Sequence, residues 1–223
     1  MTRRLQFLIC LFPLFSLTAA PLKQATVTTV VNDVNLLPEA APPKPAAVND
    51  DVRDNTAVRT GAESRSELTF TDATIARLGA NTIFTFNEGT RQMDLGGGAM
   101  LLRVPKGAGG ARISTAAVTA AITGTTVLMQ YDRKSYAKLI VLEGTACLAL
   151  KDKPQDCVPV KAGQLMQVPV NPPPDSLPAP VDVDLSRLVE TSGLLSSDFA
   201  PLPSIPLITA AVQEQAAAKQ DST

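Results

Sequence analysis

Short runs of alternating apolar and polar residues dominate the middle of the chain. The runs are rich in Val, Ile, Thr and Phe, and Gly, Asn or Asp interrupts them every eight to twelve residues. They lie around residues 68–70, 75–79, 83–86, 101–103, 127–129, 139–141 and 165–167. A period of two places successive side chains on opposite faces of a strand, whereas a helix needs a period near 3.6. The pattern predicts an all-β domain, either a twisted β-solenoid or a sandwich, since both share this alternation.

Glycine and proline divide the chain into parts. Twelve of the 13 Gly lie between Gly61 and Gly163, whereas only three of the 18 Pro lie between Ala46 and Val168. Pro-rich stretches favour extended geometry and cannot build a core, so those on either side of this region are interpreted as spacers. We therefore predict a leader at 1–20, a Pro/Ala-rich linker at 21–45, the β domain at 46–168 and a Pro-rich tail with short helices at 169–223.

The tail carries two helix patterns. Asp184 is placed to cap a short helix whose Leu185, Leu188 and Val189 share one face, with Gly193 as its stop. We expect this helix to cover an edge or an end of the β core. Residues 209–220 contain strong helix formers but only a weak apolar face, so a second helix there is expected to fray.

Residues 1–20 have the layout of a secretory signal peptide. Arg3 and Arg4 precede an apolar stretch from Leu5 to Leu17, and small residues end the segment. The stretch is shorter than the roughly 20 residues that span a bilayer, which disfavours the alternative of an uncleaved anchor. We therefore expect a periplasmic or otherwise exported protein of the cell envelope, with no membrane span after cleavage.

Charge and composition narrow the function. The chain has 20 Lys and Arg against 21 Asp and Glu, and removing residues 1–20 changes the net charge from −1 to −3. A nucleic-acid partner is not expected, because binding phosphate needs a basic surface. The chain has no His, which excludes Ser-His-Asp and Cys-His catalysis and His-ligated zinc. We predict no enzyme, and no cofactor or metal.

Two cysteines remain after the leader is removed. Cys147 and Cys157 enclose a polar segment with a Pro, and folding it as a hairpin about Asp152 sets the two cysteines opposite each other. Opposed strand positions lie within bridging distance, and an even pair in an oxidising compartment normally forms a disulfide. We predict a structural bridge, because the CxxC spacing typical of redox sites is absent.

Several short motifs match chemical sites but are better explained as structure. Ser135 and Lys138 fit the S-x-x-K pattern, yet they lie in a turn-and-strand region without the companion motifs. The glycine-rich segment 107–112 precedes a strand and not a helix, so it is a poor phosphate loop. The acidic cluster at 50–54 lacks the alternation of a calcium loop, and a solvated domain entry is favoured.

Arginine occurs about once per predicted strand or turn. These residues could form a stripe for an anionic glycan or an acidic protein, although the polar face of a two-faced sheet is favoured. The set is Arg53, Arg59, Arg65, Arg77, Arg91, Arg103 and Arg112.

Four segments resemble, in order, the FecR-like periplasmic domain family. Residues 58–86 are similar to its opening strands, with Thr60, Gly61 and Asp72 at matching places. Residues 112–130 resemble its V-x-T-P…R-G-T stretch, with Gly124 and Thr125 kept, whereas Ala116 replaces the Pro and Thr123 the Arg. Residues 139–150 and 160–164 match its V-x-V-x-E-G-x-V and V-x-x-G-[QE] segments, which contain Gly144 and Gly163.

The resemblance implies an all-β domain exposed to the periplasm, in which the motif residues have structural roles. We expect glycines 61, 79, 124, 144 and 163 to occupy turns or bulges where a Cβ would clash or φ must be positive. Signalling members of the family hold a sigma factor with a cytoplasmic arm. Only four residues precede the apolar segment here, so we expect no regulator of that design.

Two functions remain as hypotheses. The first is a non-enzymatic envelope protein whose domain binds another envelope protein, with strand addition at an exposed edge as the binding mode. The alternative is a module that binds cell-wall glycan. Sugar sites favour exposed aromatic side chains, and the β domain offers no Trp and only Tyr131 and Tyr136 as tyrosines.

Overall fold

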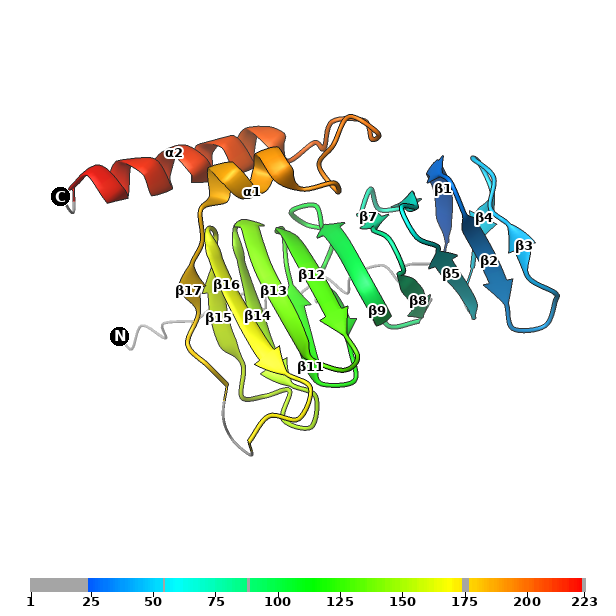
Figure 1. The fold of residues 1–223 in the computed structure, drawn as a ribbon, viewed down its shortest axis with the longest axis horizontal. Coiled ribbons are helices and arrows are strands. Elements are labelled where there is room, and N and C mark those ends of the chain that lie inside the picture. Colours follow the sequence, from blue (N-terminus) through cyan, green and yellow to red (C-terminus); the bar gives the residue numbers. More distant parts are fainter. Residues whose placement is uncertain (1–23, 54, 88, 174–176, 222–223) are drawn as a thin grey trace, which may run out of the picture.

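The computed structural model describes residues 24–53, 55–87, 89–173 and 177–221. Within them the strands form one hydrogen-bonded sheet of 17 strands that folds into two facing layers, with two helices on one side (Figure 1). The all-β prediction is confirmed, and the arrangement is sandwich-like. The predicted leader at 1–20 lies outside the described residues.

The first layer is antiparallel throughout. From the N-terminal end its order is β4 (Asp51–Val52), β1 (Ala25–Val31), β6 (Arg65–Phe70), β7 (Ile75–Leu78), the second half of β9 (Gln92–Arg103), β12 (Thr126–Asp132), β13 (Tyr136–Glu143), β16 (Gln164–Pro169) and β17 (Val181–Asp182).

The second layer lies behind the first and has a matching order. It runs β3 (Lys44–Pro45), β2 (Val34–Pro38), β5 (Thr56–Thr60), β8 (Ile83–Asn87), the first half of β9, β10 (Ala111–Ser114), β11 (Val118–Ile122), β14 (Thr145–Leu150) and β15 (Val158–Lys161). Strands β9 and β10 are parallel. Since the chain keeps passing between the layers, its winding is solenoid-like.

Strand β9 passes from one layer to the other at three consecutive glycines, Gly96 to Gly98. Its first half pairs with β8 up to Gly97, and its second half pairs with β12 from Gly98 onward. Gly98 has φ +92°, and a Cβ there would lie 2.4 Å from Thr82 Oγ1 and 2.5 Å from its Cα. Only glycine fits this position, because both the backbone conformation and the space exclude a side chain.

One apolar core fills the space between the layers. Inward-facing residues alternate along each strand, as with Val127 and Met129 in β12, which are fully buried while Leu128 between them faces outward. The core also includes Ala25 and Val27 of β1 and Val34 and Leu36 of β2. Their burial shows that the predicted linker at 21–45 is wrong over these strands.

The linker prediction failed because the Pro-rich stretch at 38–45 is only the end of that segment. Residues 25–36 have the period-two alternation of a strand pair, and β1 pairs along almost the whole of β6. The N-terminal boundary of the β fold therefore lies about 20 residues earlier than residue 46.

Both helices of the tail are present. Helix α1 (Leu185–Thr191) begins after Asp184, whose side chain accepts a hydrogen bond from Arg187 N, and ends with Ser192 as its C-cap, one residue before Gly193. Helix α2 (Ile205–Asp221) follows, and both lie across the ends of the strands in the first layer (Figure 1). No helix in the described part of the chain is long and apolar enough to cross a membrane.

The edge strands of both layers are short, and those of the second layer contain proline. The two-residue strands β4 and β17 close the first layer, and the second layer ends at β3, with Pro45, and at β15, with Pro159. Proline offers no N–H to an added strand, and short edges bind few residues. Strand addition is therefore poorly supported as a binding mode.

Candidate functional site

The outer face of the first layer is partly covered by the C-terminal segment. A second apolar cluster joins Leu101 of β9 and Leu142 of β13 to residues of the tail. The tail members are Leu185, Leu194, Phe199, Leu202 and Ile208. Since these side chains are buried against the sheet, the tail is part of the folded structure and not a free spacer.

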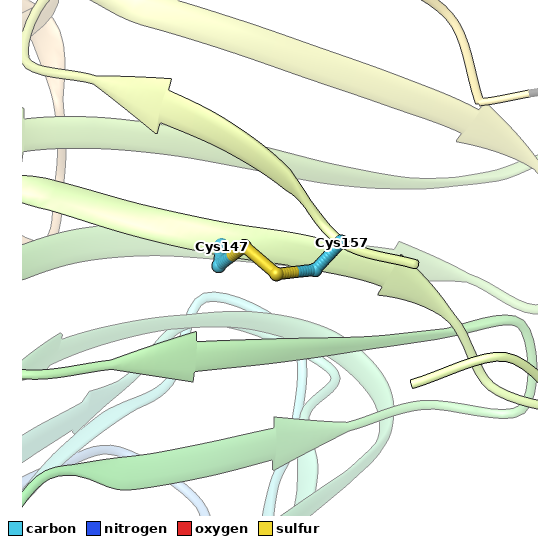
Figure 2. Close-up of a disulfide and its surroundings, with 2 residues drawn as sticks. All are labelled: Cys147 and Cys157. Carbon is cyan, nitrogen blue, oxygen red and sulfur yellow. A yellow bond between two sulfur atoms is a disulfide. The ribbon is translucent and has the colours of Figure 1, made fainter. Parts of the chain in front are cut away.

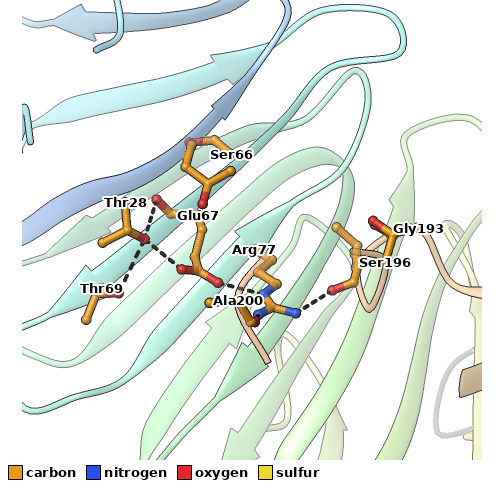
Figure 3. Close-up of polar contacts among 10 residues, drawn as sticks. Thr28, Ser66, Glu67, Thr69, Arg77, Gly193, Ser196 and Ala200 are labelled. Atoms are coloured by element: carbon orange, nitrogen blue, oxygen red, sulfur yellow. Dashed lines mark hydrogen bonds and ion pairs between the residues drawn. The ribbon is translucent and has the colours of Figure 1, made fainter. Parts of the chain in front are cut away.

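A buried ion pair fastens this segment to the sheet (Figure 3). Arg77 of β7 is 2% exposed, and its Nε donates to Glu67 Oε2 at 2.7 Å. Its two terminal nitrogens donate to backbone oxygens of the tail, to Leu194 O at 2.9 Å and to Ala200 O. The guanidinium also lies over the Phe199 ring, 4.5 Å from its centroid. Burial lowers the pKa of Arg77, while Glu67 acts in the opposite direction.

Two further contacts hold the same segment. Arg65 Nη2 lies 2.5 Å from Asp198 Oδ2. On the other side, Thr126 Oγ1 donates to the buried carboxylate of Glu143 at 2.9 Å and lies 2.8 Å from Ser204 Oγ, just before α2. Between α1 and α2 the tail is thus held at four points, Leu194, Asp198, Ala200 and Ser204.

A groove of about 340 Å³ lies between α1 and the outer face of the first layer. Its floor is formed by small or apolar side chains of the strands, and Leu188 and Leu194 form the opposite wall. The lining on the sheet side includes Arg65, Gly79, Ala80, Ala99, Leu128, Gln130, Lys138 and Ile140. The hollow forms because Gly79 and Ala99 carry almost no side chain beside bulkier neighbours.

Strand register aligns the polar residues of the groove in one row. Lys138 of β13 lies opposite Gln130 of β12, and Gln130 lies opposite Ala99 of β9. Beyond Ala99 the row continues to Gly79, whose N donates to Ala99 O. It ends at Arg65 of β6, because Ser66 pairs with Leu78 and the neighbouring residues Arg65 and Gly79 therefore lie opposite each other. A cation therefore stands at each end of the row, and the lining contains no Asp or Glu.

Sequence reasoning named three of these residues for other reasons, Gly79 as a turn or bulge glycine among them, and missed the groove. Lys138 appeared in the S-x-x-K match, and Arg65 in the arginine set. Gln130 and Ala99 gave no signal, because the groove exists only where α1 packs on a sheet about 50 to 120 residues away in the chain.

The predicted disulfide is present (Figure 2). Cys147 and Cys157 are bonded with their Cα atoms 5.5 Å apart. The register differs from the prediction, since Cys147 lies opposite Pro159 and Cys157 immediately precedes β15. The turn is therefore centred one residue later than Asp152, and the bond links a strand to the end of a loop.

The family-motif residues near the N-terminal end form turns. Thr60 Oγ1 donates to Gly79 O at 2.5 Å and accepts from Thr82 N. At Gly61 a Cβ would lie 2.6 Å from Asp33 Oδ2. Asp72 accepts from both the N and Oγ1 of Thr74 and from Arg91 Nη2. These contacts connect neighbouring turns and leave none of these residues in the groove.

The remaining motif residues also lie in turns between strands. Gly124, Gly144 and Gly163 have φ of +59°, +80° and +76°. The hydroxyl of Thr125 lies 3.0 Å from Thr123 O and 3.2 Å from Thr145 O. In the loop between β8 and β9, Arg91 also has a positive φ, +55°.

Arginine does not form a uniform solvated face. Arg77 and Arg91 are buried, at 2% and 7% exposure, and both are held by carboxylates, Glu67 and Asp72. The expectation of a polar outer face fails at these two positions because folded segments of the chain cover them.

The other singled-out motifs have structural environments. Ser135 lies in the β12–β13 turn, and residues 107–110 form the loop before β10. In the acidic cluster, Asp50 accepts from Ala47 N at 2.9 Å and pairs with Lys44 Nζ at 3.0 Å. The backbone hydrogen bond, followed by Lys44, lowers the pKa of Asp50.

The two tyrosines do not form an aromatic platform. Tyr131 is 5% exposed and faces the core between the layers. Tyr136 faces outward on β13 beneath the Lys138 ammonium, 5.5 Å from the ring centroid.

The sequence matches a family model described as "FecR protein" over residues 56–147. This segment is a FecR domain. The match covers β5 to the first half of β14, and it includes the part of the sheet that forms most of the groove floor. The resemblance inferred from the motifs is confirmed.

Two crystal structures of a proposed anti-sigma factor from Parabacteroides distasonis ATCC 8503 are similar to the chain. One has a TM-score of 0.50 at 12% identity and covers 60% of this chain and 64% of that chain. The other has a TM-score of 0.48 at 13% identity and covers 56% and 59%. The chain thus spans less than two thirds of these proteins, and the likeness concerns the fold. No curated protein matches the sequence.

Proposed function

We propose that this chain is a non-enzymatic protein-interaction module of the cell envelope, and that its partner binds in the groove beside α1. Three features support the proposal. The chain contains a FecR domain, its leader has the pattern of an export signal, and the edges of its layers are too short and too rich in proline for strand addition.

The groove is the observation that carries the proposal. It combines an apolar floor with polar groups on its rim, which is the composition of sites that bind an apolar segment and fix its orientation. Its floor comes from the FecR domain and its wall from α1, and the contacts of Arg77 hold the wall in place. The glycan alternative lacks a comparable site, because Tyr131 is buried and Tyr136 stands alone.

Site-specific photocrosslinking in cells tests this function. A photoreactive amino acid at Gln130, in the groove, is compared with one at Thr119, which faces outward on β11 in the second layer. We expect a discrete protein adduct at Gln130 and none at Thr119. Both positions are half-buried on a strand, so the comparison isolates the groove.

A plug variant makes the test specific. Ala80 is exposed and lines the groove, so Ala80→Trp fills the entrance without disturbing the core. We expect the Gln130 adduct to disappear in Ala80→Trp while the melting temperature stays unchanged. Adducts of equal yield at Gln130 and Thr119, or an adduct that survives the plug, would refute the proposal. Capture only in wall-bound material would favour glycan binding.

Export is tested separately on the full chain. We expect the protein in the envelope fraction, with an N-terminus that begins near residue 20. A chain that stays uncleaved in the cytoplasm would refute the proposed location in the cell envelope.

A further inference from the structure

The groove lining carries two cations, of which Arg65 is paired with Asp198 outside the lining and Lys138 makes no ion pair in the described residues. The lining contains no acidic residue. Among the described residues no carboxylate lies within 4.0 Å of Lys138 Nζ, which lies over the Tyr136 ring. An apolar floor between two cations is complementary to an apolar segment that carries negative charge at both ends.

Arg65 has donor capacity left for a ligand. Its Nη2 pairs with Asp198, but its Nε is buried and has no hydrogen-bond partner in the part of the chain that the structure describes. The side chain is 30% exposed, and Nη1 approaches Gly193 on the groove wall. Because part of the side chain is exposed, a carboxylate in the groove can reach the guanidinium, and a charge-assisted hydrogen bond of this kind is strong.

The distance between the two cations sets the length of the ligand. Lys138 and Arg65 stand in the same row on β13 and β6, with β12, β9 and the end of β7 between them. Four steps between neighbouring strands, at about 4.8 Å each, separate their backbones by about 19 Å. An extended peptide advances about 3.3 Å per residue, so this distance corresponds to about six residues.

Resting on the proposed function, we infer that the partner enters the groove as an extended segment that crosses the strands and carries two carboxylate side chains six residues apart. An even spacing puts both carboxylates on the same face of the segment, together with the residues at the second and fourth positions between them. Those two residues face the floor on either side of Ala99 and are small or apolar. The Gln130 amide and the Thr191 and Ser192 hydroxyls lie beside the segment and bind its backbone.

Synthetic peptides test this ligand chemistry directly on the full chain. The probe is acetyl-Glu-Thr-Val-Thr-Val-Thr-Glu-amide with a fluorescent label, and binding is measured by anisotropy. One comparison peptide has Gln in place of both Glu, and another has the same composition with the two Glu three residues apart, on opposite faces. We expect each lost charge contact to weaken binding about three- to fivefold, and higher salt to weaken only the first peptide strongly.

A charge exchange identifies the contact. Lys138→Glu is expected to weaken the first peptide more than Lys138→Gln does, and to regain affinity for a peptide with Lys in place of one terminal Glu. Lys138 is half-buried on a strand and makes no ion pair with the described residues, so both variants are expected to fold. Ala80→Trp serves as the control that blocks the groove.

The outcomes separate this inference from the proposed function. A groove adduct in cells together with peptides that bind regardless of charge or spacing would overturn the inference and leave the function standing. Loss of both the adduct and the peptide binding would overturn both. Vesicles of an anionic phospholipid serve as a competing ligand. If they bound as tightly as the first peptide, and Lys138→Gln weakened both by the same factor, a peptide ligand would also be refuted. We expect strong binding only for the peptide with two Glu six residues apart. In Lys138→Glu we expect the preference to change to the peptide with Lys in place of one Glu.

Discussion

Replacing Arg77 by Met is expected to destabilise the protein by about 3–5 kcal/mol. The substitution leaves the Glu67 carboxylate, which is 6% exposed, with Thr28 Oγ1 at 2.7 Å as its remaining side-chain donor. It also removes the donors to Leu194 O and Ala200 O. Breaking a buried ion pair by removing one partner costs about this much, because the other charge stays buried and uncompensated. The measurement is the free energy of unfolding of the full chain in urea.

A second variant separates the charge from the contacts with the tail. In Glu67→Gln with Arg77→Met both charges are gone, so we expect about 2 kcal/mol of the loss to be regained, while the two backbone oxygens remain without donors. Glu67→Gln alone should cost less than Arg77→Met, because Arg77 keeps its bonds to the tail. Hydrogen exchange should show faster exchange at 194–200 only where Arg77 is replaced. A loss below about 1 kcal/mol in Arg77→Met, or strictly additive single variants, would refute this reasoning.

Three further predictions concern stability. Removing the Cys147–Cys157 bridge with a double Ser variant should cost about 2.5–3 kcal/mol and lower the melting temperature by about 5–10 °C; an unchanged midpoint in reductant would contradict this. Gly98→Ala should prevent stable folding, because its Cβ would lie 2.5 Å from the Cα of Thr82. Gly107→Ala should cost only about 1–2 kcal/mol of backbone strain, because Gly107 has φ +85° but open space around its Cβ position. Equal losses in the two would refute the steric argument. Folding lowers the pKa of Asp50, so its ionised carboxylate stabilises the fold above the ordinary aspartate pKa, and this stabilisation is lost as the pH falls through the lowered pKa. In Asp50→Asn the free energy of unfolding, measured against pH, should therefore fall less steeply on the acid side.

The strand pattern was sufficient to predict the fold class and the positions of many strands. Alternation identified β6, β7, β8, β12, β13 and β16, and the even pair of cysteines identified the disulfide. The N-terminal strands were missed because the Pro-rich stretch at 38–45, which is typical of a linker, directly follows the alternating residues 25–36. The register at Cys147 was wrong because one extra residue in a turn changes the opposed positions without changing the alternating pattern.

Buried charge was the part that the sequence could not reveal. Arg77 and Arg91 occupy outward positions of strands or turns, where alternation predicts exposure. They are buried because the tail and neighbouring loops fold back over them, and such long-range covering leaves no periodic signal. The same reason explains why the groove was missed, since it depends on how α1 lies on the sheet.

The division of the groove between two parts of the chain bears on its specificity. Arg65, Gly79, Ala99, Gln130 and Lys138 all lie within the FecR match at 56–147, whereas the wall from Leu188 to Leu194 lies outside it. The domain therefore supplies the floor and both cations, and the tail sets the width of the groove and the groups that face the ligand backbone. Since Arg77 holds the tail through Leu194 and Ala200, a variant that releases this contact should widen the groove as well as destabilise the protein. Peptide affinity and the protection of residues 194–200 should consequently fall together in Arg77→Met, and the spacing preference should weaken with them.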